Sequence, residues 1–274
     1  MVHKAKGFNA SSRGPQGNPT RGTTHTQRMR RVDRWLLASH ASQLRHGSPL
    51  LVDLGFGAAP VTTVELFDRV RALNPRARVT GLEIDPERVR EAARASREGL
   101  SFAHGGFEVP TPERPAVIRL FNVLRQYQEA DVAEIWGRLT SRLAPGGIVV
   151  EGTCDELGRR ACWVGLDAIG PRTLTLATQL ASLEAPSDLA ERLPKALIHR
   201  NVPGEKVHAL FKAMGAEWAA STAVAPFGLR QRWRFMAARL KAAGWAVLDD
   251  DRRWRQGELT LAWEAVAPSG ERAP

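Results

Sequence analysis

Two acidic residues and two glycines have the types and spacing to bind a nucleoside. Residues 52–57 read Val-Asp-Leu-Gly-Phe-Gly, so an apolar run ends in Asp53 and continues into Gly55 and Gly57. Glycines at such positions allow a sharp backbone turn and leave room for a ligand against it. Glu83 follows at the end of the next apolar run, where a carboxylate can accept hydrogen bonds from both hydroxyls of a ribose. The sequence therefore indicates a site for a nucleoside-containing ligand.

These residues need adjacent parallel strands to bring them together. Short apolar runs alternate with helical stretches, and the runs lie at residues 50–54, 79–84, 100–103, 116–121 and 148–151. Alternation of this kind predicts an α/β fold with a doubly wound, mostly parallel sheet. A helix over residues 229–243 and two strands over 245–248 and 258–263 would complete a seven-stranded sheet.

The remaining residues suggest the domain organisation. We expect the α/β domain to comprise residues 47–156 and 229–267, with residues 157–228 inserted as a cap beside the strand ends. An extension of the sheet without ligand contact is the alternative for that insertion. The other segments are predicted as a disordered basic tail (1–26), an N-terminal helix (27–46) and a C-terminal tail (268–274).

With these motifs, the sequence resembles the class I S-adenosylmethionine (SAM)-dependent methyltransferases. The resemblance covers about residues 50–155 and resumes over about residues 229–265. Residues 53–57 are similar to the family's first motif, and Leu-Ala-Pro-Gly-Gly at 143–147 is similar to its turn into the fifth strand. Two positions depart from the family pattern, because Ala59 replaces a frequent third glycine and Gly106-Phe107 replaces an acid that often contacts adenine.

The resemblance implies SAM as the cofactor and a set of residues that bind it. In this sequence the matching positions are Asp53, Gly55, Gly57, Ala58, Glu83, Ile84, Gly106, Phe107 and Asn122. It also implies an in-line methyl transfer, in which positioning and desolvation matter more than any universal catalytic residue.

Candidate catalytic residues follow the fourth apolar run. We single out Asn122, which could orient a nitrogen of the substrate, and Tyr127, which packing alone could equally explain. Enzymes that methylate adenine or glutamine have Asn-Pro-Pro-Tyr here, whereas this sequence has Val123 and Leu124 after Asn122. That difference argues against such chemistry.

Two other functions remain open. A nicotinamide-dependent oxidoreductase also uses a glycine-rich turn and an acid, but Pro60 stands at its third glycine position and has no amide hydrogen. A non-catalytic RNA-binding protein on the same fold is the other alternative, and it would bind RNA without turning over a cofactor.

The basic residues suggest RNA as the methyl acceptor, ahead of a small molecule or a protein. The net charge is +10, and residues 1–34 contribute +7 of it, from eight Lys and Arg against Asp33. A second stretch, 229–255, has eight Lys and Arg against three Asp. Clusters of cations attract phosphate, although a solvated tail is the simpler explanation.

Composition limits the compartment and the metal chemistry. The sequence has neither a membrane-spanning apolar run nor the apolar core of a signal peptide, so we expect a cytoplasmic protein that does not enter a membrane. Its two cysteines, Cys154 and Cys162, form no Cys-x-x-Cys pair, so we expect free thiols and no metal site.

Overall fold

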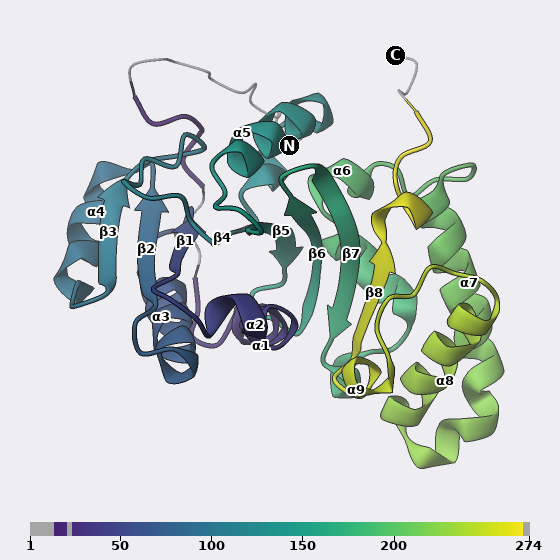
Figure 1. Ribbon diagram of the computed structural model, residues 1–274. Coiled ribbons are helices and arrows are strands. Elements are labelled where there is room, and N and C mark those ends of the chain that lie inside the picture. The colour runs from purple at the N-terminus through teal and green to yellow at the C-terminus, as the bar shows by residue number, and fades with distance from the viewer. Residues whose placement is uncertain (1–13, 21–23, 271–274) are drawn as a thin grey trace. The chain divides into compact units, whose positions relative to one another are not determined.

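The structure is a computed structural model that describes residues 14–20 and 24–270. The chain divides into two compact units, the first made of residues up to Gly158 together with Leu166–Gly170, and the second of Arg159–Gly165 and the residues from Pro171 onward. Figure 1 shows the elements of both units with the labels used below.

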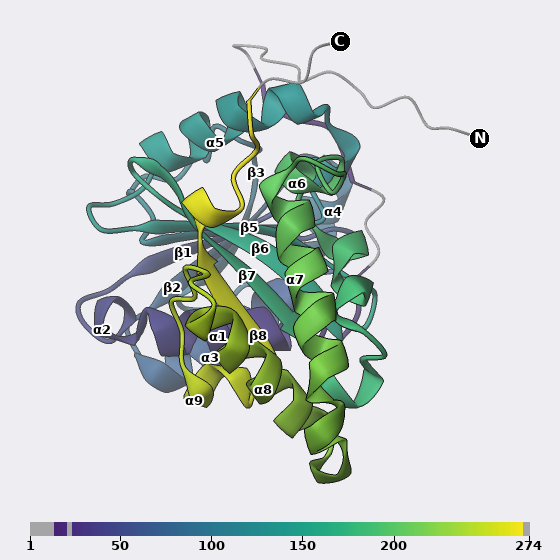
Figure 2. The same cartoon turned by 90° about the vertical axis from the view of Figure 1, so that its right-hand side faces the viewer.

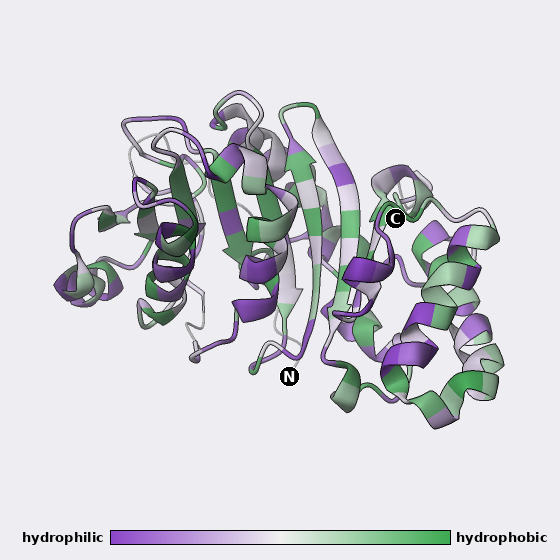
Figure 3. Ribbon diagram, turned by 60° about the horizontal axis from the view of Figure 1, so that its bottom comes forward, coloured by the Kyte–Doolittle hydropathy of each residue, from purple (hydrophilic) through white to green (hydrophobic). Residues whose placement is uncertain are grey.

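The first unit is built on five parallel strands in the order β3-β2-β1-β4-β5. They are β1 (Leu50–Leu54), β2 (Arg78–Glu83), β3 (Leu100–His104), β4 (Val117–Phe121) and β5 (Ile148–Cys154). Every residue of β1 and β5 is buried, as expected for parallel strands covered on both faces. Figure 3 shows the hydrophobic character of these strands in green. This confirms the predicted α/β, doubly wound, mostly parallel sheet.

Helices cover both faces of the five strands. The helices α1 (Arg30–Ser39), α2 (Ala41–Leu44) and α3 (Val61–Leu73) lie on one face, and α5 (Val132–Ser141) lies on the other (Figure 2). The helix α4 (Pro86–Ala92) follows β2 along the chain and begins after Asp85, whose side chain accepts hydrogen bonds from the amides of Glu87 and Arg88. The helix predicted for residues 27–46 is divided in two at His40.

The order of the strands determines where a ligand can bind. The chain runs outward from β1 through β2 to β3 and then returns to the other side of β1 as β4. In such sheets, ligands bind beyond the carboxyl ends of the strands at the point where the order reverses. Here Leu54 pairs with Leu82 and with Leu120, so the segments after β1, β2 and β4 begin side by side.

The second unit has three more strands, β6 (Arg160–Asp167), β7 (Gly170–Thr178) and β8 (Glu258–Ala262). β6 and β7 are neighbours in the sheet, and β7 pairs with β8 in antiparallel fashion. The segment predicted as a cap, 157–228, therefore supplies strands beside β8, and its role as a cap stays a prediction. Its helices α6 (Lys195–Ile198) and α7 (Lys206–Ala220) precede α8 (Leu229–Ala242) and α9 (Asp251–Trp254).

One predicted strand is absent, and the strand count differs. We predicted seven strands including residues 245–248, but that segment forms only an isolated bridge between Val247 and Leu261. The described residues form eight strands, because β6 and β7 lie in the segment predicted as an insertion and yet join the sheet. Trp254, in the segment before β8, is 8% exposed, and its indole donates a hydrogen bond to Asp249.

Both cysteines are free and buried. Cys154 ends β5 in the first unit and is 2% exposed, whereas Cys162 lies in β6 in the second unit and is fully buried. Among the described residues there is no group of three or more His, Cys, Asp or Glu that could hold a metal ion. No helix within the described ranges is both long and apolar enough to cross a membrane.

Candidate functional site

The turn after β1 depends on its glycines. Gly55 has φ +74° and Gly57 has φ +89°, which is backbone that residues with a Cβ rarely adopt. A Cβ on Gly55 would also lie 2.7 Å from Cγ2 of Val123, in the segment after β4. The backbone amide of Gly55 donates to the carbonyl of Leu82 at 2.7 Å. These contacts hold the turn against the ends of β2 and β4.

Glu83 ends β2 beside this turn, as its spacing from Gly57 predicts. Its side chain is only 1% exposed, and Oε2 accepts a hydrogen bond from the amide of Gly57 at 2.9 Å. Oε1 accepts from the amide of Ile84 at 3.0 Å and from that of Asp85 at 3.3 Å. Because each carboxylate oxygen has two lone pairs, acceptor capacity remains for a ligand.

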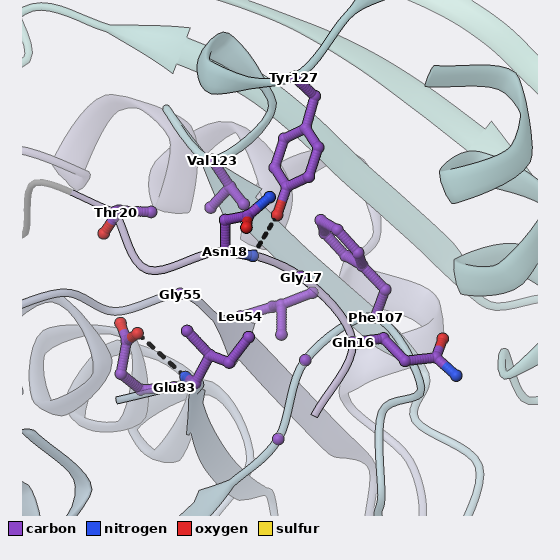
Figure 4. Close-up of a pocket in the computed structure, with 13 residues that line it drawn as sticks. Gln16, Gly17, Asn18, Thr20, Leu54, Gly55, Glu83, Phe107, Val123 and Tyr127 are labelled. Atoms are coloured by element: carbon purple, nitrogen blue, oxygen red, sulfur yellow. Dashed lines mark hydrogen bonds between the residues drawn. The ribbon is translucent and has the colours of Figure 1, made fainter. Parts of the chain in front are cut away.

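Glu83 borders a pocket at the carboxyl ends of β1, β2 and β4, whose space of about 280 Å³ includes open solvent. Figure 4 shows most of its lining side chains. Six residues that the sequence analysis selected reach this pocket: Gly55, Glu83, Ile84, Gly106, Phe107 and Tyr127. Four others are not among its lining residues: Asp53, Gly57, Ala58 and Asn122.

Asp53 belongs to a buried network of charges beneath the turn. Its carboxylate accepts hydrogen bonds from Nε of Arg119 at 3.0 Å and from the hydroxyl of Thr63 at 2.7 Å. The Arg119 guanidinium, in β4, is fully buried and also bonds to Asp33 of α1. Arg69 of α3 pairs with the same Asp33 at 2.5 Å. Asp53 is therefore engaged with protein cations and hydroxyls, and its contact with a cofactor stays a prediction.

Asn122 and Tyr127, the two candidate catalytic residues, both have polar partners within the protein. Asn122 has φ +60°, and its side chain accepts from the amide of Cys154 at 3.1 Å and donates to Sγ of that residue at 3.4 Å. The Tyr127 hydroxyl accepts from the amide of Asn18 at 2.5 Å. Burial raises the pKa of Tyr127 to about 12, although the hydrogen bond from Asn18 acts in the opposite direction. Asn122 thus connects the ends of β4 and β5, while Tyr127 forms part of the pocket wall.

The N-terminal segment 16–20 contributes to the pocket, which the sequence analysis missed. We predicted disorder for residues 1–26, and of these, residues 1–13 and 21–23 lie outside the described residues. Gln16, Gly17, Asn18 and Thr20 instead line the pocket and bond to residues around it. No local pattern predicts these contacts, because a segment rich in Gly, Pro and Asn has no apolar periodicity and its hydrogen-bond partners are distant in the sequence.

The sequence analysis also missed other residues, and the sequence contains a recognisable signal for only some of them. Leu54, Gly105 and Val123 also line the pocket, and each is a chain neighbour of a residue that was selected. Arg119 carried a clear signal, because a cation in an otherwise apolar strand must find a buried acid. Its partners Asp33 and Asp53 could not be identified from spacing.

The basic stretch 229–255 is largely paired within the second unit. Six of its eight cations have polar or aromatic partners, Arg232, Arg234, Arg239, Lys241, Arg253 and Arg255. For example, Arg239 pairs with Glu217 at 2.7 Å, and the Arg232 guanidinium lies 4.1 Å from the centroid of the Trp218 ring. This stretch therefore presents less unpaired positive charge than its composition indicates.

Comparison with known proteins gives likeness in structure over about half of the chain. A scan against protein-family models finds no match, and a search of curated proteins finds none either. Human N-acetylserotonin methyltransferase in complex with SAM is similar at 24% identity and a TM-score of 0.32, over 48% of this chain and 39% of that one. The corresponding values for magnesium protoporphyrin IX methyltransferase from Synechocystis PCC 6803 with bound SAH are 18% and 0.37, over 47% and 56%.

The mitomycin 7-O-methyltransferase is similar at 21% identity and a TM-score of 0.31, over 45% of this chain and 38% of that one. The chain thus spans between 38% and 56% of the length of these three structures. Its first unit has five parallel strands in the order β3-β2-β1-β4-β5, a glycine turn after β1 and a buried acid at the end of β2. In this fold the chain resembles the class I SAM-dependent methyltransferases.

Proposed function

We propose that the protein is a SAM-dependent methyltransferase. The observation that carries the proposal is the buried carboxylate of Glu83, which borders a pocket at the carboxyl ends of β1 and β2 beside the glycine turn. A carboxylate at this place is suited to the two hydroxyls of a ribose. The neighbours crystallised with SAM or SAH are consistent with that cofactor.

The residues around the pocket are suited to the other parts of SAM. Ile84 and Phe107 offer apolar side chains on either side of the place for a base. Gly55 lets the turn after β1 approach Val123 closely, because a Cβ there would lie 2.7 Å from Cγ2 of Val123, and the methionine part would lie along this turn.

The cofactor, when bound, supplies a methyl group on a sulfonium, which is already activated for in-line displacement by a nucleophile. The chain's own contribution is to orient the two reactants and exclude water. We propose that Asn122 contributes by fixing the ends of β4 and β5 through its two bonds to Cys154. Direct catalytic roles for Asn122 and Tyr127 stay predictions.

Binding of SAH, the demethylated product, tests the proposal by isothermal titration calorimetry. We expect one site per chain, and we expect Glu83→Gln to weaken binding by about 1–3 kcal/mol, because ribose hydroxyls lose an ionised acceptor. Glu87→Gln is the matched control, since Glu87 is an exposed acid in the first turn of α4. Binding of NADH in place of SAH would instead favour the oxidoreductase. Equal loss of SAH affinity in Glu83→Gln and Glu87→Gln would contradict a specific role of Glu83 in binding the ribose.

The prediction of the methyl acceptor depends on the charge of the chain, which is less specific than the pocket that supports the cofactor. RNA was the acceptor predicted ahead of a small molecule or a protein. Because most cations of residues 229–255 have partners, the case for RNA rests mainly on the +7 charge of residues 1–34. A small-molecule acceptor is the alternative that a test of RNA binding would favour if it gave a negative result.

A further inference from the structure

The segment Gln16–Thr20 crosses the pocket and is held from several sides. At Gln16, the amide donates to Glu108 at 2.7 Å, and the carbonyl accepts from the amide of Phe107 at 2.9 Å. Farther along the segment, the Asn18 amide donates to the Tyr127 hydroxyl, and the Thr20 carbonyl accepts from Arg88 at 3.0 Å. Figure 4 shows this segment passing between Tyr127 and Phe107 on one side and Glu83 on the other.

Gly17 occupies the space between the two apolar side chains expected to enclose the base. A Cβ on Gly17 would lie 3.4 Å from Cε2 of Phe107 and 3.6 Å from Cδ1 of Ile84. The Cα of Gly17 lies one bond length from that position, so an aromatic ring that entered between Phe107 and Ile84 would overlap the Gly17 backbone. Gly106 is covered as well, because a Cβ on it would lie 2.0 Å from the Gln16 carbonyl oxygen.

We propose that residues 16–20 are a built-in competitor of the nucleoside, which must leave the base-binding half of the pocket before the cofactor can bind. This inference rests on the proposed function. The segment suits a reversible role, because it buries no large apolar side chain and is held mainly by hydrogen bonds. Such bonds contribute little net free energy, since the same groups bond to water after detachment.

The inference predicts the direction in which a weakened segment changes cofactor affinity. A protein whose binding-competent state is only partly populated binds with a Kd raised by the inverse of that fraction. Changes that detach residues 16–20 should therefore tighten SAH binding. A segment that closed over the bound cofactor would give the opposite result, because its contacts would be lost from the complex.

Gly17→Val in the full chain is the sharpest test. Gly17 has φ +137°, and a Cβ on it would lie 3.1 Å from the Tyr127 hydroxyl oxygen, so valine disfavours the docked segment without altering the sheet. We expect SAH to bind about tenfold more tightly by calorimetry. Gly14→Val is the matched control, because a Cβ on Gly14 meets nothing within 4 Å, and it should leave the affinity unchanged.

A second variant and a second measurement guard against a local effect of the valine. Asn18→Pro removes the amide hydrogen that donates to Tyr127, and it should also tighten SAH binding. Hydrogen exchange should show faster exchange at the amides of Asn18 and Phe107 when SAH binds to the unmodified chain, because both amides lose their partners. Melting temperatures close to that of the unmodified chain would show that the variants are folded.

The outcomes separate this inference from the proposed function. Equal or weaker SAH binding by both Gly17→Val and Asn18→Pro, with SAH bound by the unmodified chain, would overturn the competitor and leave the methyltransferase proposal intact. Unchanged or slower exchange at Asn18 on SAH binding would overturn it too. Failure of SAH to bind to any of the chains would overturn the proposed function, and the competitor with it.

Discussion

The carboxyl group of Glu151 lies in the middle of β5 and is 1% exposed. Burial raises its pKa to about 8, against a smaller lowering by a hydrogen bond from Trp136. Between pH 4.5 and about 8 the folded chain therefore holds a proton here that the unfolded chain has lost. The contribution of Glu151 to stability is complete below pH 4.5 and is lost as the pH rises toward 8.

Glu151→Gln should remove this dependence on pH. Relative to the unmodified chain, we expect the variant's free energy of unfolding to gain up to about 1.4 kcal/mol per pH unit across that interval. Urea denaturation at pH 5, 6, 7 and 8 measures the difference. Glu156→Gln alters an exposed acid just beyond the same strand and serves as the control. Parallel stability curves for the unmodified chain and Glu151→Gln would contradict the assignment.

Residues of the site could be predicted from the sequence when they lie within a motif. Glu83 and Gly55 were found because the end of one strand and the turn after another have fixed places in this type of sheet. Asp53 and Asn122 have partners that are 66 and 32 residues away, Arg119 and Cys154. Because no local pattern encodes such pairs, the sequence predicts a ligand for Asp53 and Asn122 but does not identify their partners within the protein.

At the scale of elements, Arg119 joins three of them. Its guanidinium bonds to Asp53 of β1, to Asp33 of α1 and to the Thr62 carbonyl in α3. All three side chains of this charged group are buried, with exposed fractions of 5% or less. The N-terminal helix is therefore attached to the sheet by charge as well as by the apolar side chains that it buries.

Arg119→Met should destabilise the first unit strongly. It leaves the carboxylates of Asp33 and Asp53 buried with fewer cations, and removal of one partner from a buried pair typically costs about 3–5 kcal/mol. Chemical denaturation measures the loss. Arg78→Met is the control, because Arg78 pairs with Glu113 at the surface, and it should change stability little. A small loss for Arg119→Met would mean that water replaces the guanidinium.

The parallel strands and their helices were predictable because periodicity and turn residues repeat along residues 50–154. The helical stretch expected between the first two apolar runs is α3, from Val61 to Leu73. Pairings with distant segments were not predictable, namely the pairing of β8 with β7 and the contacts of segment 16–20 with the pocket, although β8 itself was predicted over residues 258–263. Their backbone partners lie about 80 to 110 residues away in the sequence.

At the scale of the whole molecule, the net charge of +10 is unevenly distributed and tests the RNA acceptor. Deleting residues 1–13 removes Lys4, Lys6 and Arg13 and keeps residues 14–20 and the pocket. If RNA is bound through these cations, affinity should fall, and the log–log slope against salt should flatten by about 2 units. Filter binding at several salt concentrations measures both quantities.

SAH affinity is the control for this deletion and should not change. Absence of RNA binding by the full chain at low salt would contradict the RNA acceptor. The internal pairing of residues 229–255 then leaves a small-molecule acceptor as the alternative to test.

Each of the two units contains one buried cysteine, whose reactivity can report the opening of that unit. Cys154 belongs to the first unit and Cys162 to the second, and both thiols are shielded from solvent. A thiol reagent can reach either sulfur only when the surrounding unit opens, so the rate of alkylation reports the frequency of that opening. Peptide mass spectrometry distinguishes the two labelled sites in one sample. The alkylation rates of Cys154 and Cys162 therefore show which unit opens more often, without any added probe.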